Sequence, residues 1–145
     1  MFNHVLLPTD GSKLSQDAVR KGVQLARCMN ARVTGVSVVP KLQFFAYDAE
    51  TPKNIKDAAA RECRQSAEAH LAFVRRAAEE AGVTCEVVTE AGDQPHAAII
   101  RTAEKRRCDL IMMASHGRRG ISGVLLGSET LKVLTHSKIP VLVFR

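Results

Sequence analysis

Hydrophobic positions along the chain follow two alternating patterns. Short apolar runs, several of them dense in β-branched side chains, are typical of strands buried in a sheet. They cover residues 4–9, 32–39, 83–89, 110–113 and 141–144. Each run is separated from the next by a longer stretch, and parallel neighbours need a crossover connection. The pattern therefore predicts an α/β fold with a doubly wound, five-stranded parallel sheet and helices on both faces.

The stretches between these runs carry apolar residues at helical spacing. They predict helices over residues 13–30, 54–81, 93–107 and 127–137. Ser12 is suited to cap the first helix. Asn54 and Asp57 approximate a capping box for the second helix, and Gly82 is placed to end it.

Composition indicates a single domain covering residues 1–145. The chain has 145 residues, of which 46% are hydrophobic and 25% charged, as in an ordinary globular domain. Its longest strongly apolar runs are about five residues, against roughly 20 for a membrane span. The first residues lack a basic region followed by a long apolar stretch, so we expect a cytoplasmic protein without a secretory signal.

Cysteines and histidines are scattered along the chain. Cys28, Cys63, Cys85 and Cys108 form no C-x-x-C pair, and the histidines show no His-x-x-x-His spacing. This distribution disfavours zinc and predicts that the cysteines are buried free thiols.

The formal charge of +6 favours an anionic partner. Nucleic acid is disfavoured, because base stacking uses exposed aromatics and the sequence has only five Phe and one Tyr. Half of these aromatics, Phe44, Phe45 and Tyr47, lie in the long connection 40–53. Two interpretations stay open: the rings pack on the sheet or the long helix, or the segment forms a lid or a subunit contact.

The loops after the first and fourth strands are the candidate functional loops, because open α/β sheets bind ligands at the carboxyl ends of their strands. After the first strand, Pro8 and Thr9 lead into Asp10, Gly11 and Ser12. An ionised Asp10 can accept hydrogen bonds from a ribose or an adenine amino group. The alternative is that Asp10 or Ser12 only caps the helix.

The segment after the fourth strand predicts phosphate binding. Four glycines lie between Gly117 and Gly127, which lets backbone amides approach a ligand closely. Gly127-Ser128 then opens a helix, whose first N–H groups bind anions, and Arg118 and Arg119 can add charge-assisted hydrogen bonds. The alternative is a flexible loop with solvated arginines. The spacing matches neither a P-loop nor the dinucleotide-binding signature.

His116 lies beside this segment. It has no paired nucleophile in the sequence, so a loop side chain with local contacts is the expected role.

Taken together, these motifs resemble the universal stress protein family over essentially the whole chain. ATP-binding members of the family carry glycine, two residues, glycine, nine residues and then Gly-Ser or Gly-Thr. Ala114, Gly117 and Gly127-Ser128 keep that spacing here. The family's opening segment matches residues 5–12, and its closing Pro-Val-Leu-Val matches residues 140–143.

This resemblance implies an adenine nucleotide alpha hydrolase-like fold with strand order 3-2-1-4-5. It also implies a regulatory stress-response protein that binds ATP or another adenine nucleotide, with or without Mg, and hydrolyses it slowly or not at all. Asp10 would face the nucleoside, Val38 would meet adenine through its backbone, and Met113 would line the ribose. The implied binding residues are Pro8, Thr9, Asp10, Val38, Met113, Ala114, Gly117, Arg118, Gly127, Ser128 and Glu129, the last through its amide.

One residue departs from the family motif: Ala114 stands where the motif has glycine. Its methyl group would crowd the ribose or the first phosphate, or be harmless if the backbone there is an ordinary strand end. We expect binding that is weakened but survives.

A homodimer through Val141 to Phe144 is also implied by the family. Two other functions stay open, a nucleotide-free dimeric interaction protein and a weak ATPase. The sequence does not indicate which signalling partner the protein has.

Overall fold

The computed structural model of the chain describes residues 1–41, 50–117 and 126–145. Its strands are β1 (His4–Pro8), β2 (Arg32–Val39), β3 (Cys85–Ala91), β4 (Leu110–Ala114) and β5 (Val141–Phe144). Its helices are α1 (Lys13–Met29), α2 (Lys53–Ala81), α3 (Pro95–Arg106) and α4 (Ser128–His136). Each strand and helix that the hydrophobic pattern predicts is present, with small shifts at the ends.

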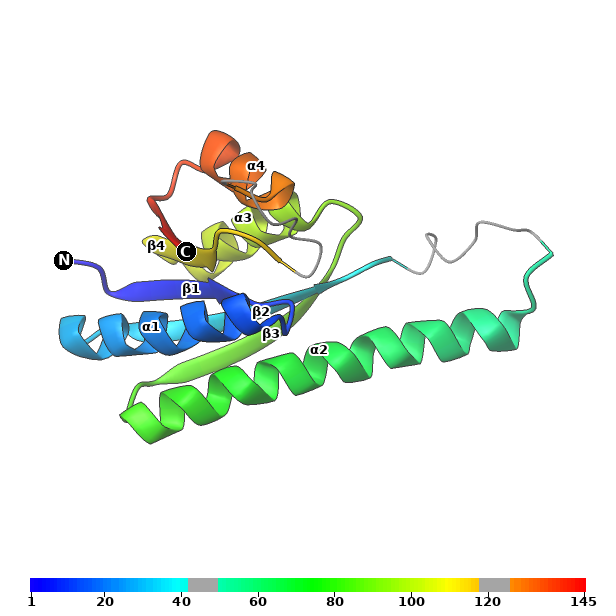
Figure 1. Cartoon of the computed structure of the whole chain (residues 1–145), viewed down its shortest axis with the longest axis horizontal. Helices are drawn as coiled ribbons and strands as arrows, with labels where there is room; N and C mark the ends of the chain where they lie inside the picture. The colour runs from blue at the N-terminus through cyan, green and yellow to red at the C-terminus, as the bar shows by residue number, and fades with distance from the viewer. Residues whose placement is uncertain (42–49, 118–125) are drawn as a thin grey trace.

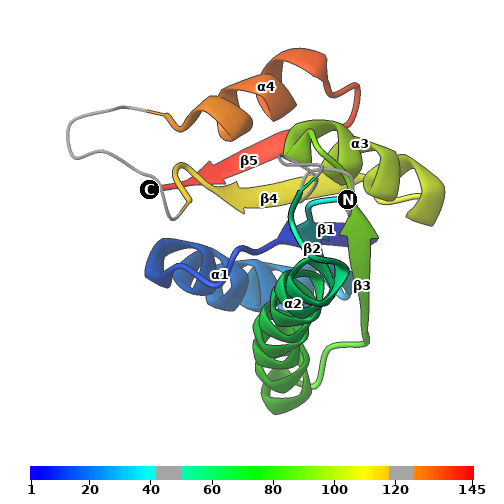
Figure 2. The same ribbon diagram turned by 90° about the vertical axis from the view of Figure 1, so that its right-hand side faces the viewer.

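The strands form one parallel sheet in the order β3-β2-β1-β4-β5, as expected from the family resemblance. In Figure 2, α1 and α2 lie on one face of the sheet, and α3 and α4 lie on the other. From β1 the chain first builds outward through β2 and β3, and then returns to add β4 and β5 on the opposite side. The strand order therefore reverses between β1 and β4, where sheets of this type bind ligands.

Two apolar layers make up the core, because alternate residues of a strand point to opposite faces of the sheet. Val5 and Leu7 pack on the α1 and α2 side, whereas Leu6 packs with Ile111 and Val133 on the α3 and α4 side. All residues of β1 and β4 are buried, which is why their sequences are continuously apolar. β3 lies at an edge, as its sequence pattern predicts, but its exposure alternates only in part, because Val87 and Val88 are both half-buried.

The long helix α2 packs closely against β2. A Cβ atom at Gly35 in β2 would come within 2.9 Å of Cγ1 of Val74, so the absence of a side chain there allows the close approach. Figure 1 shows α2 running alongside β2 and β3, with its first turns extending beyond the sheet.

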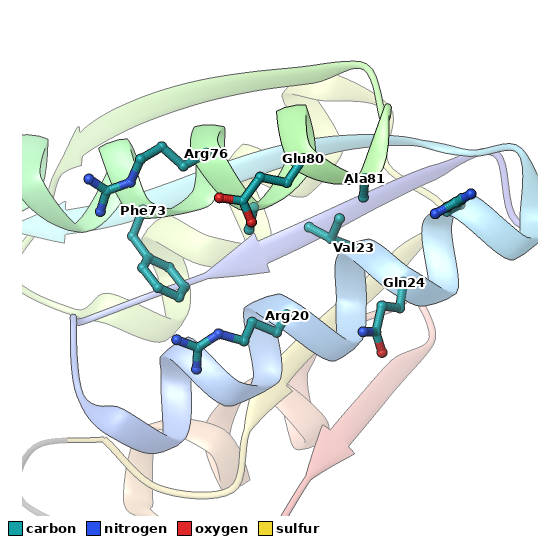
Figure 3. Close-up of a pocket in the computed structure, with 9 residues that line it drawn as sticks. Arg20, Val23, Gln24, Phe73, Arg76, Glu80 and Ala81 are labelled. Carbon is teal, nitrogen blue, oxygen red and sulfur yellow. The ribbon is translucent and has the colours of Figure 1, made fainter.

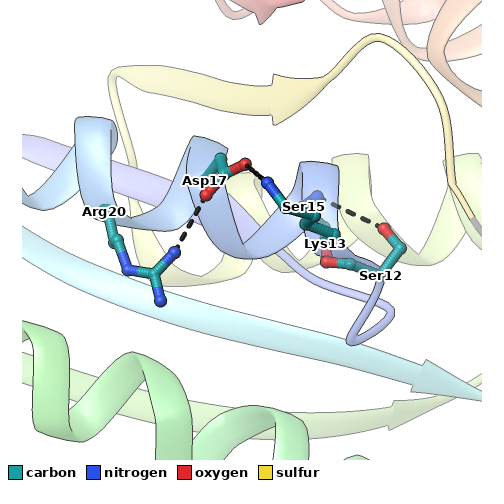
Figure 4. Close-up of polar contacts among 5 residues, drawn as sticks. All are labelled: Ser12, Lys13, Ser15, Asp17 and Arg20. Carbon is teal, nitrogen blue, oxygen red and sulfur yellow. Dashed lines mark hydrogen bonds and ion pairs between the residues drawn. The ribbon is translucent and has the colours of Figure 1, made fainter.

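Two of the predicted helix ends are confirmed. The N–H of Ser15 donates to Oγ of Ser12 at 3.2 Å, which makes Ser12 the N-cap of α1; Figure 4 shows this contact. Gly82 ends α2 in the left-handed conformation with φ of 67°, as glycine commonly does after a helix.

The predicted starts of α2 and α3 are wrong. α2 begins at Lys53 with Pro52 as its N-cap and no side-chain cap. The Pro52 carbonyl already accepts from the N–H of Ile55 at 3.1 Å, so Asn54 lies inside the first turn and cannot cap it. α3 begins at Pro95, not Asp93, because proline, with its fixed φ and missing N–H, suits the first helical position.

The expectation of buried cysteines is confirmed only for Cys108. Cys28 is exposed, and Cys63 and Cys85 are half-buried. Cys28 follows Arg27 on the solvent side of α1, where both residues are exposed. Burial raises the pKa of the Cys108 thiol to about 11, so this thiol is protonated and poorly reactive at neutral pH.

Phe44, Phe45, Tyr47, Arg118 and Arg119 lie outside the described residues, and so do the expectations attached to them. Within the described ranges, no helix is both long enough and apolar enough to cross a membrane.

Candidate functional site

The loop after β1 is held in place by its own polar groups. The N–H of Thr9 donates to the carbonyl of Val36 in β2 at 2.9 Å. The buried hydroxyl of Thr9 accepts from the N–H of Gly11 at 3.2 Å and lies 3.1 Å from Oγ of Ser15. These bonds connect the loop to both β2 and the first turn of α1, which fixes the residue between Thr9 and Gly11.

That residue is Asp10, and its two carboxylate oxygens have different surroundings. Oδ1 accepts from the N–H of Ser12 at 3.0 Å, in a local turn at the start of α1. Oδ2 faces Gly117, since a Cβ atom placed at Gly117 would collide with it. Asp10 therefore takes part in the helix-start turn and also faces the loop that follows β4.

The loops after β1 and β4 thus meet where the strand order reverses. Gly117 lies three residues beyond Ala114, the end of β4. The intervening residues are anchored, because the N–H of Ser115 donates to the carbonyl of Phe144 at 2.7 Å. The lack of a side chain at Gly117 leaves room for the carboxylate of Asp10.

A histidine of α2 supports the first of these loops. Gly11 has a φ of +76°, and a Cβ atom there would collide with the imidazole ring of His70. Sequence reasoning missed this role of His70, because a single histidine on a long polar helix carries no signal of what its ring contacts.

The start of α4 is joined to the end of β4. The hydroxyl of Thr130 donates to the carbonyl of Ala114 at 3.0 Å, and the N–H of Gly127 donates to the carbonyl of Ser115 at 2.7 Å. Ala114 itself is buried and pairs regularly with Phe144 of β5. Its backbone is therefore that of an ordinary strand end.

Gly127 is the N-cap of α4 and provides no side-chain cap. The first N–H groups of a helix have no partner within the helix, and the positive end of the helix dipole lies there. Ser128, the first helical residue, is exposed. This helix start combines backbone donors with access for a ligand, an arrangement that favours anions.

The side chain of Glu129 is held by neighbouring residues of α3 and α4. Its Oε2 accepts from the N–H of His96 at 2.8 Å and lies 3.0 Å from Nδ1 of the same residue. Its Oε1 accepts from Nζ of Lys132 at 3.0 Å. Burial alone would raise the pKa of Glu129, but the bonds from Lys132 and His96 outweigh it and hold the pKa below its ordinary value. Sequence reasoning missed this bridge between the starts of α3 and α4.

The remaining expected residues lie on the same edge of the sheet. Pro8, Val38 and Met113 are at or near the carboxyl ends of β1, β2 and β4. Pro8 and Met113 are buried, whereas Val38 is half-buried. Among the described residues, Asp10 and Gly117 are the two candidate site residues that come from different loops and lie directly against each other.

His116 makes the local contact expected of it, since its Nδ1 lies 2.9 Å from Oγ of Ser115. The described ranges contain no cluster of three or more His, Cys, Asp or Glu residues that could hold a metal ion.

Comparisons with known proteins agree with this architecture. Universal stress protein MJ0531 of Methanocaldococcus jannaschii is 32% identical over 145 residues, covering all of this chain and 83% of that protein. The solved structure of MJ0577 from the same organism superposes with a TM-score of 0.80 at 24% identity, covering 99% of this chain and 95% of that one.

A crystal structure of a universal stress protein in complex with cAMP has a TM-score of 0.69 and 27% identity, covering 99% of this chain and 97% of that one. The sequence model of the universal stress protein family matches residues 1–145. The chain therefore belongs to the universal stress protein family.

Proposed function

We propose that the protein is a regulatory module that binds an adenine nucleotide between the loops that follow β1 and β4, and that this nucleotide is ATP. The observation that carries the proposal is the apposition of Asp10 and Gly117 at the reversal of strand order. The carboxylate of Asp10, which can only accept hydrogen bonds when ionised, thereby faces the loop after β4. That loop leads to the start of α4, which has no side-chain cap and favours anions. The cAMP complex of the 27% identical relative supports an adenine nucleotide as the ligand class.

Each part of the nucleotide would meet a different group of residues. Asp10 would accept hydrogen bonds from the nucleoside, with Pro8 and Thr9 holding its loop. Adenine would contact the backbone of Val38, and the ribose would lie against Met113 and Ala114. Backbone donors for the phosphates would come from Gly117, Gly127, Ser128 and Glu129, with Arg118 adding positive charge.

Ala114 is compatible with binding in this arrangement. It is buried in regular strand pairing and is 6% exposed, so most of its surface already contacts the protein. This supports the expectation that binding survives the change from glycine. If Mg accompanies ATP, phosphate oxygens and water would supply most of its ligands, as is usual for Mg²⁺.

The proposed role is regulatory, with slow or no hydrolysis. General acid–base catalysis requires groups within hydrogen-bond reach of the reacting atoms. Oδ1 of Asp10 already accepts from Ser12, and the carboxylate of Glu129 is held by His96 and Lys132. Nucleotide would then act through a difference in affinity between two conformations.

We also propose a homodimer formed through β5. β5 lies at the end of the described sheet, and Leu142 on this strand is 42% exposed. Leu131 on α4 is 54% exposed. An apolar sheet edge favours pairing with a second strand, and two-fold dimers are the commonest oligomers.

Isothermal titration calorimetry tests the proposed function. ATP should bind once per chain, and Asp10→Ala should weaken binding by roughly 10- to 150-fold. Asp17→Asn is the matched control, because it also neutralises a carboxylate near the start of α1, and the described ion pairs of Asp17 are with Lys13 and Arg20. If wild-type protein shows no binding at millimolar ATP, or if both variants lose binding equally, the proposal is wrong.

A further inference from the structure

A groove between α1 and α2 lies away from the candidate nucleotide site. Its volume is about 430 Å³, within the range of small binding sites. Residues of the middle and last turns of α1 and of the last turns of α2 line it. Figure 3 shows Phe73 and Glu80 reaching from α2 toward α1, with Arg20 opposite Phe73. The loops after β1 and β4 contribute none of its described lining residues.

The floor of the groove is apolar. Val23 of α1 is 1% exposed and belongs to the core. Phe73, Ala77 and Ala81 of α2 are half-buried and pack against that core. The floor therefore offers an apolar surface to a side chain of a partner.

The rim of the groove is basic. Arg20 and Arg27 lie two turns apart on α1, about 10 Å along its axis at 1.5 Å per residue. Arg76 of α2 also lines the groove, and all three arginines are exposed. Glu80 is the carboxylate among the described lining residues, so the rim has an excess of positive charge. Guanidinium groups bind carboxylates and phosphates with paired hydrogen bonds.

Among these three arginines, Arg20 has described side-chain contacts. Its Cζ lies 4.9 Å from the centre of the Phe73 ring, and its Nη1 lies 2.9 Å from Oδ1 of Asp17; Figure 4 shows the second contact. The guanidinium covers a face of the Phe73 ring, so a nucleic-acid base cannot stack on that face.

We infer that this groove binds a short acidic segment of a partner protein. One apolar side chain of the segment would lie on the floor, and flanking carboxylates would pair with Arg27 and Arg76. Glu80 could accept a hydrogen bond from a backbone N–H of the segment, which a phosphate group could not donate. The separation of about 10 Å between Arg20 and Arg27 along α1 corresponds to roughly three extended residues at 3.3 Å each. The inference does not depend on nucleotide binding, because the two sites share no described residue.

The test uses fluorescence anisotropy with a labelled peptide, Glu-Asp-Leu-Asp-Glu, at 50 mM NaCl. The double variant Arg27→Glu/Arg76→Glu should weaken binding at least tenfold. Lys21→Glu/Arg75→Glu is the matched control, because it changes the charge equally on neighbouring exposed positions of the same helices that do not line the groove. The control should change the dissociation constant less than twofold. Replacing Leu in the peptide by Gly should weaken binding threefold or more.

Three results would overturn the inference. The first is no binding of the acidic peptide to the wild-type chain, and the second is equal loss in the two double variants. The third is binding of a single-stranded oligonucleotide, but not of the peptide, that depends on Arg27 and Arg76. Circular dichroism checks folding of each variant. ATP titration of the same samples separates this test from that of the proposed function, because neither double variant alters the nucleotide site.

Discussion

The contact between Asp10 and Gly117 allows a sharp prediction for Gly117→Ala. The backbone of Gly117 is outside the left-handed region, so alanine adds no conformational strain. Its Cβ would collide with Oδ2 of Asp10 and lie 3.4 Å from Cγ of that residue. To regain an ordinary van der Waals separation, the oxygen must move by roughly 1 Å.

This movement has a cost in stability and a larger cost in binding. Turning the carboxylate weakens the bond from the N–H of Ser12 to Oδ1, a contribution of about 1 kcal/mol for a partly exposed group. With the steric cost, we expect about 1–2 kcal/mol of destabilisation. A displaced Asp10 would also lose the bond to the nucleoside that we propose. That loss is about 1.5–3 kcal/mol, equivalent to roughly 10- to 150-fold weaker ATP binding.

A double-mutant cycle measures whether the contact is the cause. Urea unfolding at pH 7 without nucleotide gives the stability of wild type, Gly117→Ala, Asp10→Ala and the double variant. In the Asp10→Ala background the colliding carboxylate is gone, so Gly117→Ala should cost less than about 0.5 kcal/mol there. Costs that simply add, or ATP affinity of Gly117→Ala within twofold of wild type, would refute the reasoning.

Further predictions concern pH dependence and assembly. Burial, and next Arg32, lower the pKa of His4 below its ordinary value, so the unfolded state binds the proton more readily. Stability should fall as pH decreases below about 6.5, and His4→Gln should flatten that fall in urea titrations between pH 7.5 and 5.5. Because the pKa of Glu129 is lowered in the folded state, its ionised carboxylate contributes to folding stability above the unfolded pKa, about 4.3. That contribution is lost as pH falls through the folded pKa. Because its side chain is 35% exposed, Glu129→Gln should cost less than about 1 kcal/mol at pH 7 and leave the stability curve flatter below pH 5. Leu142→Asp should convert the proposed dimer to a monomer by light scattering at micromolar protein, and an unchanged mass would contradict the β5 interface.

Much of the fold was predictable from sequence because its signals are local. The continuous apolar run of β1 reflects burial on both faces, and Ser12 and Gly82 act at helix ends through their own conformations or side chains. The start of α2 was not predictable in the same way. A carbonyl of Pro52 replaces the expected side-chain cap, and backbone groups carry no residue-specific signal.

In the candidate site, too, the local motifs were predictable from sequence, whereas the contacts between different elements were not. Motif spacing pointed to Asp10 and Gly117, but their apposition depends on the register of two strands distant in sequence. The contact of His70 with Gly11 and the bond from the N–H of His96 to Glu129 involve partners on different elements. No periodicity within one helix reports such a pairing. The groove with Arg27 and Arg76 likewise arises only when α1 and α2 pack together.

The most direct test of the proposed nucleotide site is an ATP titration of the ¹⁵N-labelled protein, followed by measuring amide chemical shifts. Saturable shifts should concentrate at Asp10, Gly117, Gly127, Ser128 and Glu129, with the amides beside Arg27 and Arg76 unchanged. An absence of shifts at millimolar ATP, or shifts confined to the groove between α1 and α2, would contradict the proposed site.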